Sequence, residues 1–147
     1  MKSALPALTA LLVLSGCVNL DPTPDPTRHF TLASSASGAS DQAPRPTLAL
    51  VIQPVSVPDY LKRSNIVLRK GAGELTFAEF DRWAEPVENG IARVIAENLT
   101  ALLNSRFIRT SDQPGGREGE LKLNLTVVDF TTTATGEAVF TAESKLM

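Results

Sequence analysis

The sequence predicts an α+β fold, a two-layer sandwich in which one main amphipathic helix packs on a largely antiparallel sheet. Three observations predict it. Apolar residues repeat at helical spacing over residues 87–104, and two pairs of strand-like runs flank glycine-containing turns, within residues 66–77 and 121–146. A helix and a sheet that each have one apolar face must both cover it, so we expect them to pack together.

The first 16 residues have the pattern of a lipoprotein signal peptide. Lys2 precedes an apolar run, residues 4–14, that is too short to span a bilayer and has the length of a signal-peptide hydrophobic region. Leu14-Ser15-Gly16-Cys17 then resembles a lipobox, so we expect cleavage after Gly16 and lipidation of Cys17. An ordinary secretory peptide, or a core helix with a buried cysteine, is the alternative, because free cysteine often behaves as a small hydrophobe.

Residues 17–46 are interpreted as the lipidated N-terminus and a flexible tether. They are rich in Pro, Ser, Thr, Asp, Gly and Ala, and bury too little apolar surface to offset the entropy of ordering. Residues 29–32 interrupt the tether with a short alternating run, a candidate first edge strand. By resemblance to proteobacterial sorting rules, Val18 after the cysteine favours the outer membrane of a Gram-negative host, with the domain on its periplasmic face.

The periplasmic domain is expected to span residues 47–147 as a single unit. Residues 48–52 are almost continuously apolar, which is typical of a strand covered on both faces. Pro54 and Pro58 then limit the strand, because proline cannot donate to a ladder. Residues 55–61 are therefore expected to be an extended segment that leaves the sheet.

A hairpin is predicted by residues 66–69 and 75–77, which flank the turn Gly71-Ala72-Gly73. Residues 78–83 fit two structures about equally. Their aromatic residues continue an i, i+3 spacing that suits a helix, and they also suit an irregular strand.

The clearest element is an amphipathic helix over residues 87–104. Pro86 suits the first helical position, and Glu85 and Glu88 suit the positive end of the helix dipole. The predicted apolar stripe consists of Ile91, Val94, Ile95, Leu99, Leu102 and Leu103. Three polar residues lie away from this stripe: Arg93, Glu97 and Thr100.

A second hairpin is predicted in the last third of the chain. Residues 107–109 form a short strand and residues 112–119 a turn-rich loop. Residues 121–128 and 139–146 then alternate with period two around a turn at Gly136, which is the pattern of a sheet with one packed face.

Composition limits the partners and the stabilising chemistry. With 14 Lys and Arg against 16 Asp and Glu, the formal net charge is −2, and no basic surplus is present to neutralise phosphates. This argues against nucleic-acid binding. A single cysteine excludes an intramolecular disulfide, so the stability of the domain must come from packing.

Motifs for catalysis, metals or cofactors find little support. The sole histidine, His29, lies in the tether without a second His or Cys nearby, so we expect neither a metal site nor a histidine base for a nucleophilic serine. Gly71-Ala72-Gly73 lacks the further glycine of a dinucleotide fingerprint and is interpreted as a turn. Asp81, Glu85 and Glu88 could be paired carboxylates, but beside a helix start they fit better as dipole partners. We therefore expect no catalytic residue and no cofactor.

Several motifs resemble the PqiC/YmbA-type lipoproteins, auxiliary components of ABC-type or MCE-linked transport. They are the Cys17 lipobox, residues 29–32, 57–61 and 66–69 and, most specifically, residues 77–86, where Arg82-Trp83-Ala84-Glu85-Pro86 leads into the helix. The resemblance implies a periplasmic α+β domain tethered to the outer membrane and serving lipid trafficking or membrane integrity. It marks six signature residues, which we interpret as structural: Tyr60, Arg69, Phe80, Arg82, Trp83 and Pro86.

Among the aromatic signature residues, Phe80 and Trp83 are expected to be buried against the helix and the sheet. Tyr60 lies in a proline-bounded extended segment and fits burial and a surface contact about equally. Similar chains continue past this point, whereas this one stops at Met147 within an apparent strand. We therefore expect a domain that is incomplete at its C-terminus and that exposes apolar surface.

The functional hypothesis is a non-enzymatic outer-membrane lipoprotein, an accessory subunit of an ABC/MCE-type lipid transport system. Its expected partners are membrane lipid through acylated Cys17 and a periplasmic MCE-type protein, with a homo-oligomer left open. The alternative is an activator or scaffold for another envelope enzyme, such as a cell-wall synthase, which would need the same anchor and a similar domain.

Overall fold

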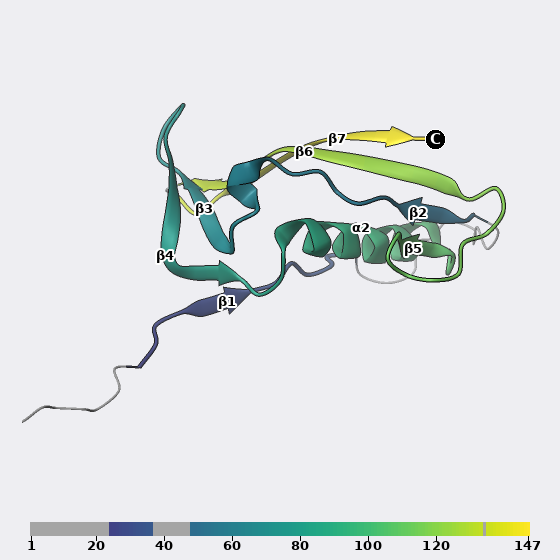
Figure 1. Ribbon diagram of the computed structural model, residues 1–147, viewed down its shortest axis with the longest axis horizontal. Coiled ribbons are helices and arrows are strands. Elements are labelled where there is room, and N and C mark those ends of the chain that lie inside the picture. Colours follow the sequence, from purple (N-terminus) through teal and green to yellow (C-terminus); the bar gives the residue numbers. More distant parts are fainter. Residues whose placement is uncertain (1–23, 37–47, 134) are drawn as a thin grey trace, which may run out of the picture.

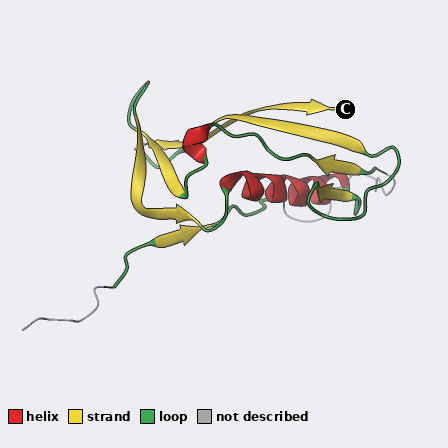
Figure 2. Cartoon of the chain, viewed as in Figure 1, coloured by secondary structure: helices red, strands yellow, loops and turns green. Residues whose placement is uncertain are grey.

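The computed structural model describes residues 24–36, 48–133 and 135–147, and it confirms the α+β fold class (Figures 1 and 2). One main helix lies along one side of a seven-stranded mixed sheet. The elements are β1 (Arg28–Phe30), β2 (Leu50–Ile52), the 3-10 helix η1 (Asp59–Leu61), β3 (Asn65–Arg69), β4 (Leu75–Trp83), α2 (Val87–Leu103), β5 (Ile108–Thr110), β6 (Leu121–Thr133) and β7 (Ala138–Leu146). In this part of the chain no helix is long and apolar enough to cross a membrane.

The long strand β6 organises the sheet. It pairs antiparallel with β7 on one side. On its other side it pairs in parallel with β2 near its start and with β3 near its end. Beyond these, β5 pairs in parallel with β2, β4 pairs antiparallel with β3, and β1 pairs in parallel with β4. The two predicted hairpins are therefore antiparallel, and parallel pairings join them into one mixed sheet.

The segment between the first hairpin and the helix is a strand. Residues 78–83, which fitted helix and strand equally, continue β4 up to Trp83, and Trp83 pairs with Phe30 of β1. Strand geometry explains why one expectation for the aromatic residues fails. Side chains three positions apart generally point to opposite faces of a strand. Trp83 packs against the core, whereas Phe80 is 44% exposed, so its predicted burial is wrong.

The helix α2 matches the predicted boundaries closely. Pro86 is the N-cap, one position before the expected N1, because its ψ of 128° is not helical. Asn104 ends the helix with a left-handed backbone (φ 47°), and its N–H donates to the carbonyl of Thr100. Left-handed caps of this kind favour Gly and tolerate Asn. Leu102, placed in the apolar stripe by its spacing, is 54% exposed, so that assignment is wrong.

The core lies between α2 and the centre of the sheet. Its deepest side chains come from β2, from the extended segment after it and from β6, with α2 contributing mainly its first turns. The buried members are Leu50, Ile52, Val55, Val57, Leu61, Val67, Val87, Ile91, Ile108, Leu125 and Val127. A row of aromatic rings extends this core: Trp83 stacks on Phe130 at 5.6 Å between centroids, and Phe140 meets Phe130 edge-on at 5.5 Å.

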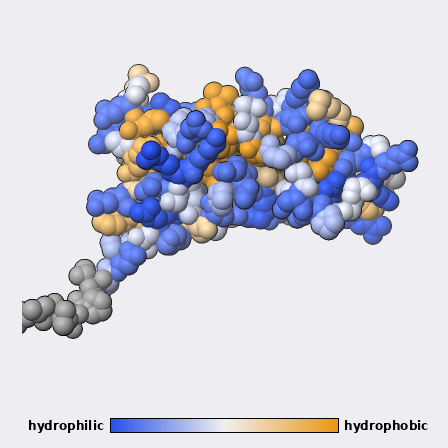
Figure 3. Space-filling view, viewed as in Figure 1, coloured by the Kyte–Doolittle hydropathy of each residue, from blue (hydrophilic) through white to orange (hydrophobic). Residues whose placement is uncertain are grey.

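β7 leaves apolar side chains uncovered, as expected from the sequence. Phe140 and Leu146 pair with Phe130 and Leu123 of β6, yet they are 47% and 55% exposed. In Figure 3 hydrophobic atoms gather in the upper half of the visible face, over β6 and its neighbours. Within the described residues, α2 covers the centre of the sheet and leaves β7 open.

Candidate functional site

A groove with a volume of about 720 Å³ runs beside α2, between the helix and the strands β2 and β5. Its lining comes from residues 52–55, from Glu85 and one side of α2, and from Ile108 and residues 110–113. The helix residues in the lining recur every three or four positions from Glu88 to Thr100, so they share one side of α2. Two of them, Ala92 and Ala96, are small, which leaves room between the helix and the sheet.

The groove has an apolar floor and an acidic rim. Ile52 and Val55 are buried members of the core at the floor. The charged lining residues of the described chain are four carboxylates, on Glu85, Glu88, Glu97 and Asp112, and one guanidinium, on Arg93. The groove therefore has a negative local charge that exceeds the weak acidity of the chain as a whole.

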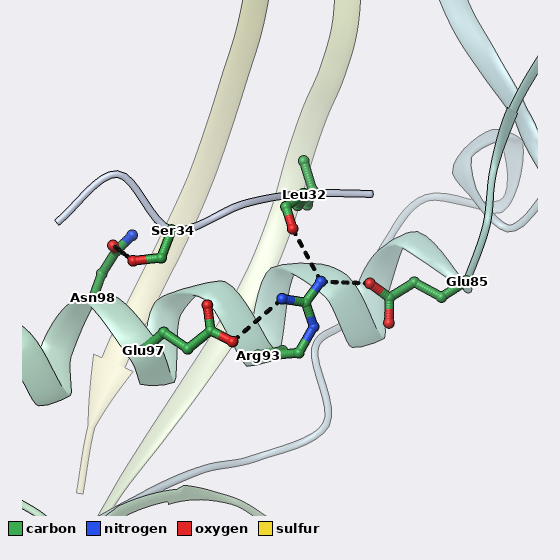
Figure 4. A network of polar contacts seen from close by, with 6 residues as sticks. All are labelled: Leu32, Ser34, Glu85, Arg93, Glu97 and Asn98. Carbon is green, nitrogen blue, oxygen red and sulfur yellow. Dashed lines mark hydrogen bonds and ion pairs between the residues drawn. The ribbon is translucent and has the colours of Figure 1, made fainter. Parts of the chain in front are cut away.

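Arg93 is shared among three acceptors (Figure 4). Its Nη2 lies 2.6 Å from Oε1 of Glu85 and donates to the carbonyl of Leu32 at 3.0 Å. Its Nη1 donates to Oε1 of Glu97, one turn along the helix, at 3.3 Å. The hydrogen bonds to Glu85 and then Glu97 raise the pKa of Arg93. One guanidinium thus fixes two carboxylates of the groove wall.

Glu88 differs from these paired carboxylates. Its Oε2 is buried and has no hydrogen-bond partner among the described residues. Lys62 is the nearby cation, and its pKa is raised chiefly by a hydrogen bond to Asp59 and least by the charge of Glu88. The Lys62 ammonium lies 2.6 Å from the Asp59 carboxylate, so its direct partner is Asp59. Glu88 therefore lines the groove with one carboxylate oxygen buried and unpaired among the described residues.

Residues 31–36, here called the strap, pack against α2 (Figure 4). Leu32 contributes to the core, and the Ser34 hydroxyl donates to Oδ1 of Asn98 at 2.6 Å. The N–H of Ala36 donates to the same oxygen at 3.0 Å. The sequence interpretation assigns residues 17–46 to a tether with one candidate edge strand at residues 29–32; the structure has a strand at Arg28–Phe30 and packs residues 28–36 on β4 and α2. The sequence does not indicate this packing because much of it consists of polar contacts with Arg93 and Asn98 of α2, which leave no apolar pattern in the segment.

The signature residues lie outside the groove and join elements of the fold. Arg69 Nη2 and the Tyr60 hydroxyl both contact Asp129 of β6, at 2.8 and 3.1 Å. Arg82 Nη1 donates to Ser64 at 3.3 Å, and Trp83 stacks within the aromatic row. These contacts are all made within the fold. Pro86, as the N-cap, marks the start of the helix, whereas Phe80 makes no contribution to the core.

Of the three carboxylates considered for catalysis, Asp81 lies outside the groove, whereas Glu85 and Glu88 both line it. Asp81 pairs with Arg28 between β4 and β1 at 2.7 and 2.8 Å, while Glu85 belongs to the Arg93 cluster. His29 is exposed on β1. No group of three potential metal ligands occurs among the described residues. The predicted cleavage and lipidation residues, Gly16 and Cys17, lie outside the described ranges.

Sequence reasoning missed the groove, although the signal was present. Arg93, Glu97 and Thr100 lie off the apolar stripe, as predicted, but a polar helix side does not by itself indicate a groove. Ala92 and Ala96 on that same side are the missed signal, since small residues beside the core leave space.

This arrangement defines a small α+β domain with an open polar groove and a strap from its N-terminal segment. The comparison with protein families is more specific. The model of the family of ABC-type transport auxiliary lipoprotein components matches residues 30–147. The chain belongs to this family and is therefore a lipoprotein auxiliary component of transport.

Two curated relatives agree with the family. The chain is 26% identical over 143 residues to the intermembrane transport lipoprotein PqiC of Escherichia coli (strain K12), which covers 97% of this chain and 73% of the relative. The PqiC of Shigella flexneri matches to the same extent. The resemblance inferred from the motifs is thereby confirmed.

Solved structures share the fold. The crystal structure of protein XCC0632 from Xanthomonas campestris superposes with a TM-score of 0.65 at 15% identity, covering 82% of this chain and 67% of that one. A crystal structure of an uncharacterized protein gives a TM-score of 0.58 at 18% identity, with coverage of 82% and 79%. At these identities the likeness shows the fold alone.

Proposed function

We propose that the protein is a non-enzymatic lipoprotein of the outer membrane that serves as an accessory subunit of an ABC/MCE-type lipid transport system and supports membrane integrity. The family match is the observation that carries this proposal. The groove agrees with it, because its lining of carboxylates, amides and small apolar residues is suited to holding a partner.

In this proposal Cys17 is acylated after cleavage at Gly16, and the lipid holds the domain at the periplasmic face of the outer membrane. Several acyl chains on one residue anchor durably, whereas a single chain binds only marginally. The domain then presents its docking surface to a periplasmic MCE-type protein.

The test is affinity purification of the tagged, lipidated protein from envelope extracts, together with a Cys17→Ser variant. We expect wild type to co-fractionate with the outer membrane and to retain a transport component. Cys17→Ser should lose lipid by mass spectrometry and leave the outer-membrane fraction. Retention of a cell-wall synthase in place of a transport component would favour the activator hypothesis, and normal fractionation of Cys17→Ser would contradict the anchor.

A further inference from the structure

The groove beside α2 has a length and a chemistry that fit an extended peptide. From Glu88 to Thr100 it follows α2 for about 18 Å at the helical rise per residue. A strand-like segment of about five residues spans that distance. Its volume of about 720 Å³ is also far larger than one side chain needs. An elongated ligand therefore fits better than a single ion.

The charges of the groove favour a ligand of positive charge. The rim holds four carboxylates, and its single guanidinium is already hydrogen-bonded to Glu85, Glu97 and the strap. Glu88 keeps a buried oxygen without a donor. Glu88 and Asp112 line the groove and have no ion-pair partner among the described residues, so their carboxylates are available to a basic side chain through charge-assisted hydrogen bonds.

The floor adds a second requirement. Val55, Ala92, Ala96 and Ile108 form the apolar part of the lining between the charged rim residues, and Ile52 beneath them is fully buried. A ligand with basic side chains alone would leave this apolar surface exposed to water. Successive side chains of an extended chain point to opposite sides, so a segment that alternates basic and apolar residues can contact both the rim and the floor.

We propose that the groove beside α2 binds an extended segment of a partner protein in which basic and apolar residues alternate. This inference rests on the proposed function, because the partner is the transport component to which the accessory subunit docks. Glu88 and Asp112 are the carboxylates left free of Arg93 to pair with the basic side chains.

The direct test is calorimetric titration of the full chain in detergent with an end-blocked hexapeptide of alternating Arg and Val. The double variant Glu88→Gln with Asp112→Asn should weaken binding at least about tenfold, as expected when charge-assisted hydrogen bonds are lost. The matched control, Glu118→Gln with Glu143→Gln, removes the same charge at exposed positions outside the groove and should stay within about twofold.

The same titration with one further variant and one further ligand tests the position and the chemistry of the groove separately. Thr100→Lys, an exposed change at the groove rim, should also weaken binding and does not depend on refolding of a buried site. Spermine should bind at least about tenfold more weakly than the hexapeptide, because it cannot use the apolar floor. Equal losses in both double variants, or equal affinity for spermine and hexapeptide, would overturn the proposal.

The purification of the lipidated protein separates this proposal from the function on which it rests. If wild type retains a transport component and the Glu88/Asp112 variant retains it equally well, the groove is not the docking site although the function stands. If wild type retains none, the proposed function itself fails.

Discussion

Tyr60, Arg69 and Asp129 form the polar cluster that ties the segment after β2 to β6. Asp129 accepts from the Tyr60 hydroxyl at 3.1 Å and from the Arg69 guanidinium at 2.8 Å. Burial raises the pKa of Tyr60 above its ordinary value of 10.0, the hydrogen bond and the charge of Asp129 raise it further, and Arg69 opposes them. The cluster thus stabilises Tyr60 as the neutral phenol.

Because Tyr60 is the sole tyrosine, its ionisation can be followed directly by phenolate absorbance. We expect a pKa above 10.0 in the folded protein, and a lower one after Asp129→Asn. A raised pKa contributes stability that is complete below the unfolded pKa and is lost as the pH rises through the folded one. Urea unfolding should therefore show that wild type loses more stability than Tyr60→Phe between neutral pH and pH values above 10. Identical titrations of folded and urea-unfolded protein would contradict this.

At this scale the sequence predicts the residues that hold the fold together better than the residues that line the groove. Trp83 and Tyr60 stand in motifs whose aromatic character already favours packing. Glu88 gives no such signal, because its place at a helix start is fully explained by the dipole. Its place in the groove lining depends on β5 and the loop after it, which form the opposite side of the groove. These segments lie more than ten residues further along the chain, so the local sequence around Glu88 does not indicate them.

The helix α2 is buried unevenly, although its apolar residues repeat evenly. Ile91, in its second turn, is 4% exposed, whereas Leu102, in its last turn, is 54% exposed. The sheet covers the start of the helix fully and its end only in part. Periodicity gives the direction of an apolar face but not how far along the helix the neighbouring layer reaches.

This difference predicts unequal costs for two chemically similar substitutions. Ile91→Ala should lower the free energy of unfolding by about 2–5 kcal/mol, the usual range for a buried aliphatic side chain. Leu102→Ala should change it by no more than about 0.5 kcal/mol, as is usual at the surface. Chemical denaturation followed by the fluorescence of Trp83, the sole tryptophan, measures both. Similar costs for the two variants would show that the end of α2 is covered as well as its start.

The strands follow the same rule at the level of elements. The β3–β4 and β6–β7 hairpins could be predicted because a turn and two alternating runs are adjacent in the sequence. The parallel pairings of β6 with β2 and β3 could not be predicted. In each of them the paired residues lie more than fifty positions apart in the sequence, and no local pattern sets the relative direction of the two strands. For the same reason the sheet was expected to be largely antiparallel and is mixed.

In the molecule as a whole, β7 forms an open edge of the sheet. It pairs with β6 alone in the described part of the chain, and its Phe140 and Leu146, like Met147 after it, are exposed. An edge strand with apolar side chains is a template for pairing with another chain.

We therefore expect the chain to self-associate through β7 as its concentration rises. Leu146→Lys places a charge on this edge at a half-exposed position and should shift the protein toward monomer in sedimentation velocity. Lys122→Glu, also exposed but on β6, serves as the control and should leave the distribution unchanged. Equal sedimentation of wild type and Leu146→Lys would exclude β7 as the contact.

The strap has a mechanical consequence for a protein held by its N-terminus. With an anchor at Cys17, tension between the membrane and the domain enters the fold at β1, which pairs with β4, and passes on to the strap. These segments extend along β4 and α2 (Figure 1), so a pull along their length loads the Arg28–Asp81 pair, the Arg93–Leu32 bond and the Asn98 contacts together rather than one after another. Arg93 passes its share of that force to Glu85 and Glu97, the wall of the groove, so tension on the anchor acts on the shape of the opening.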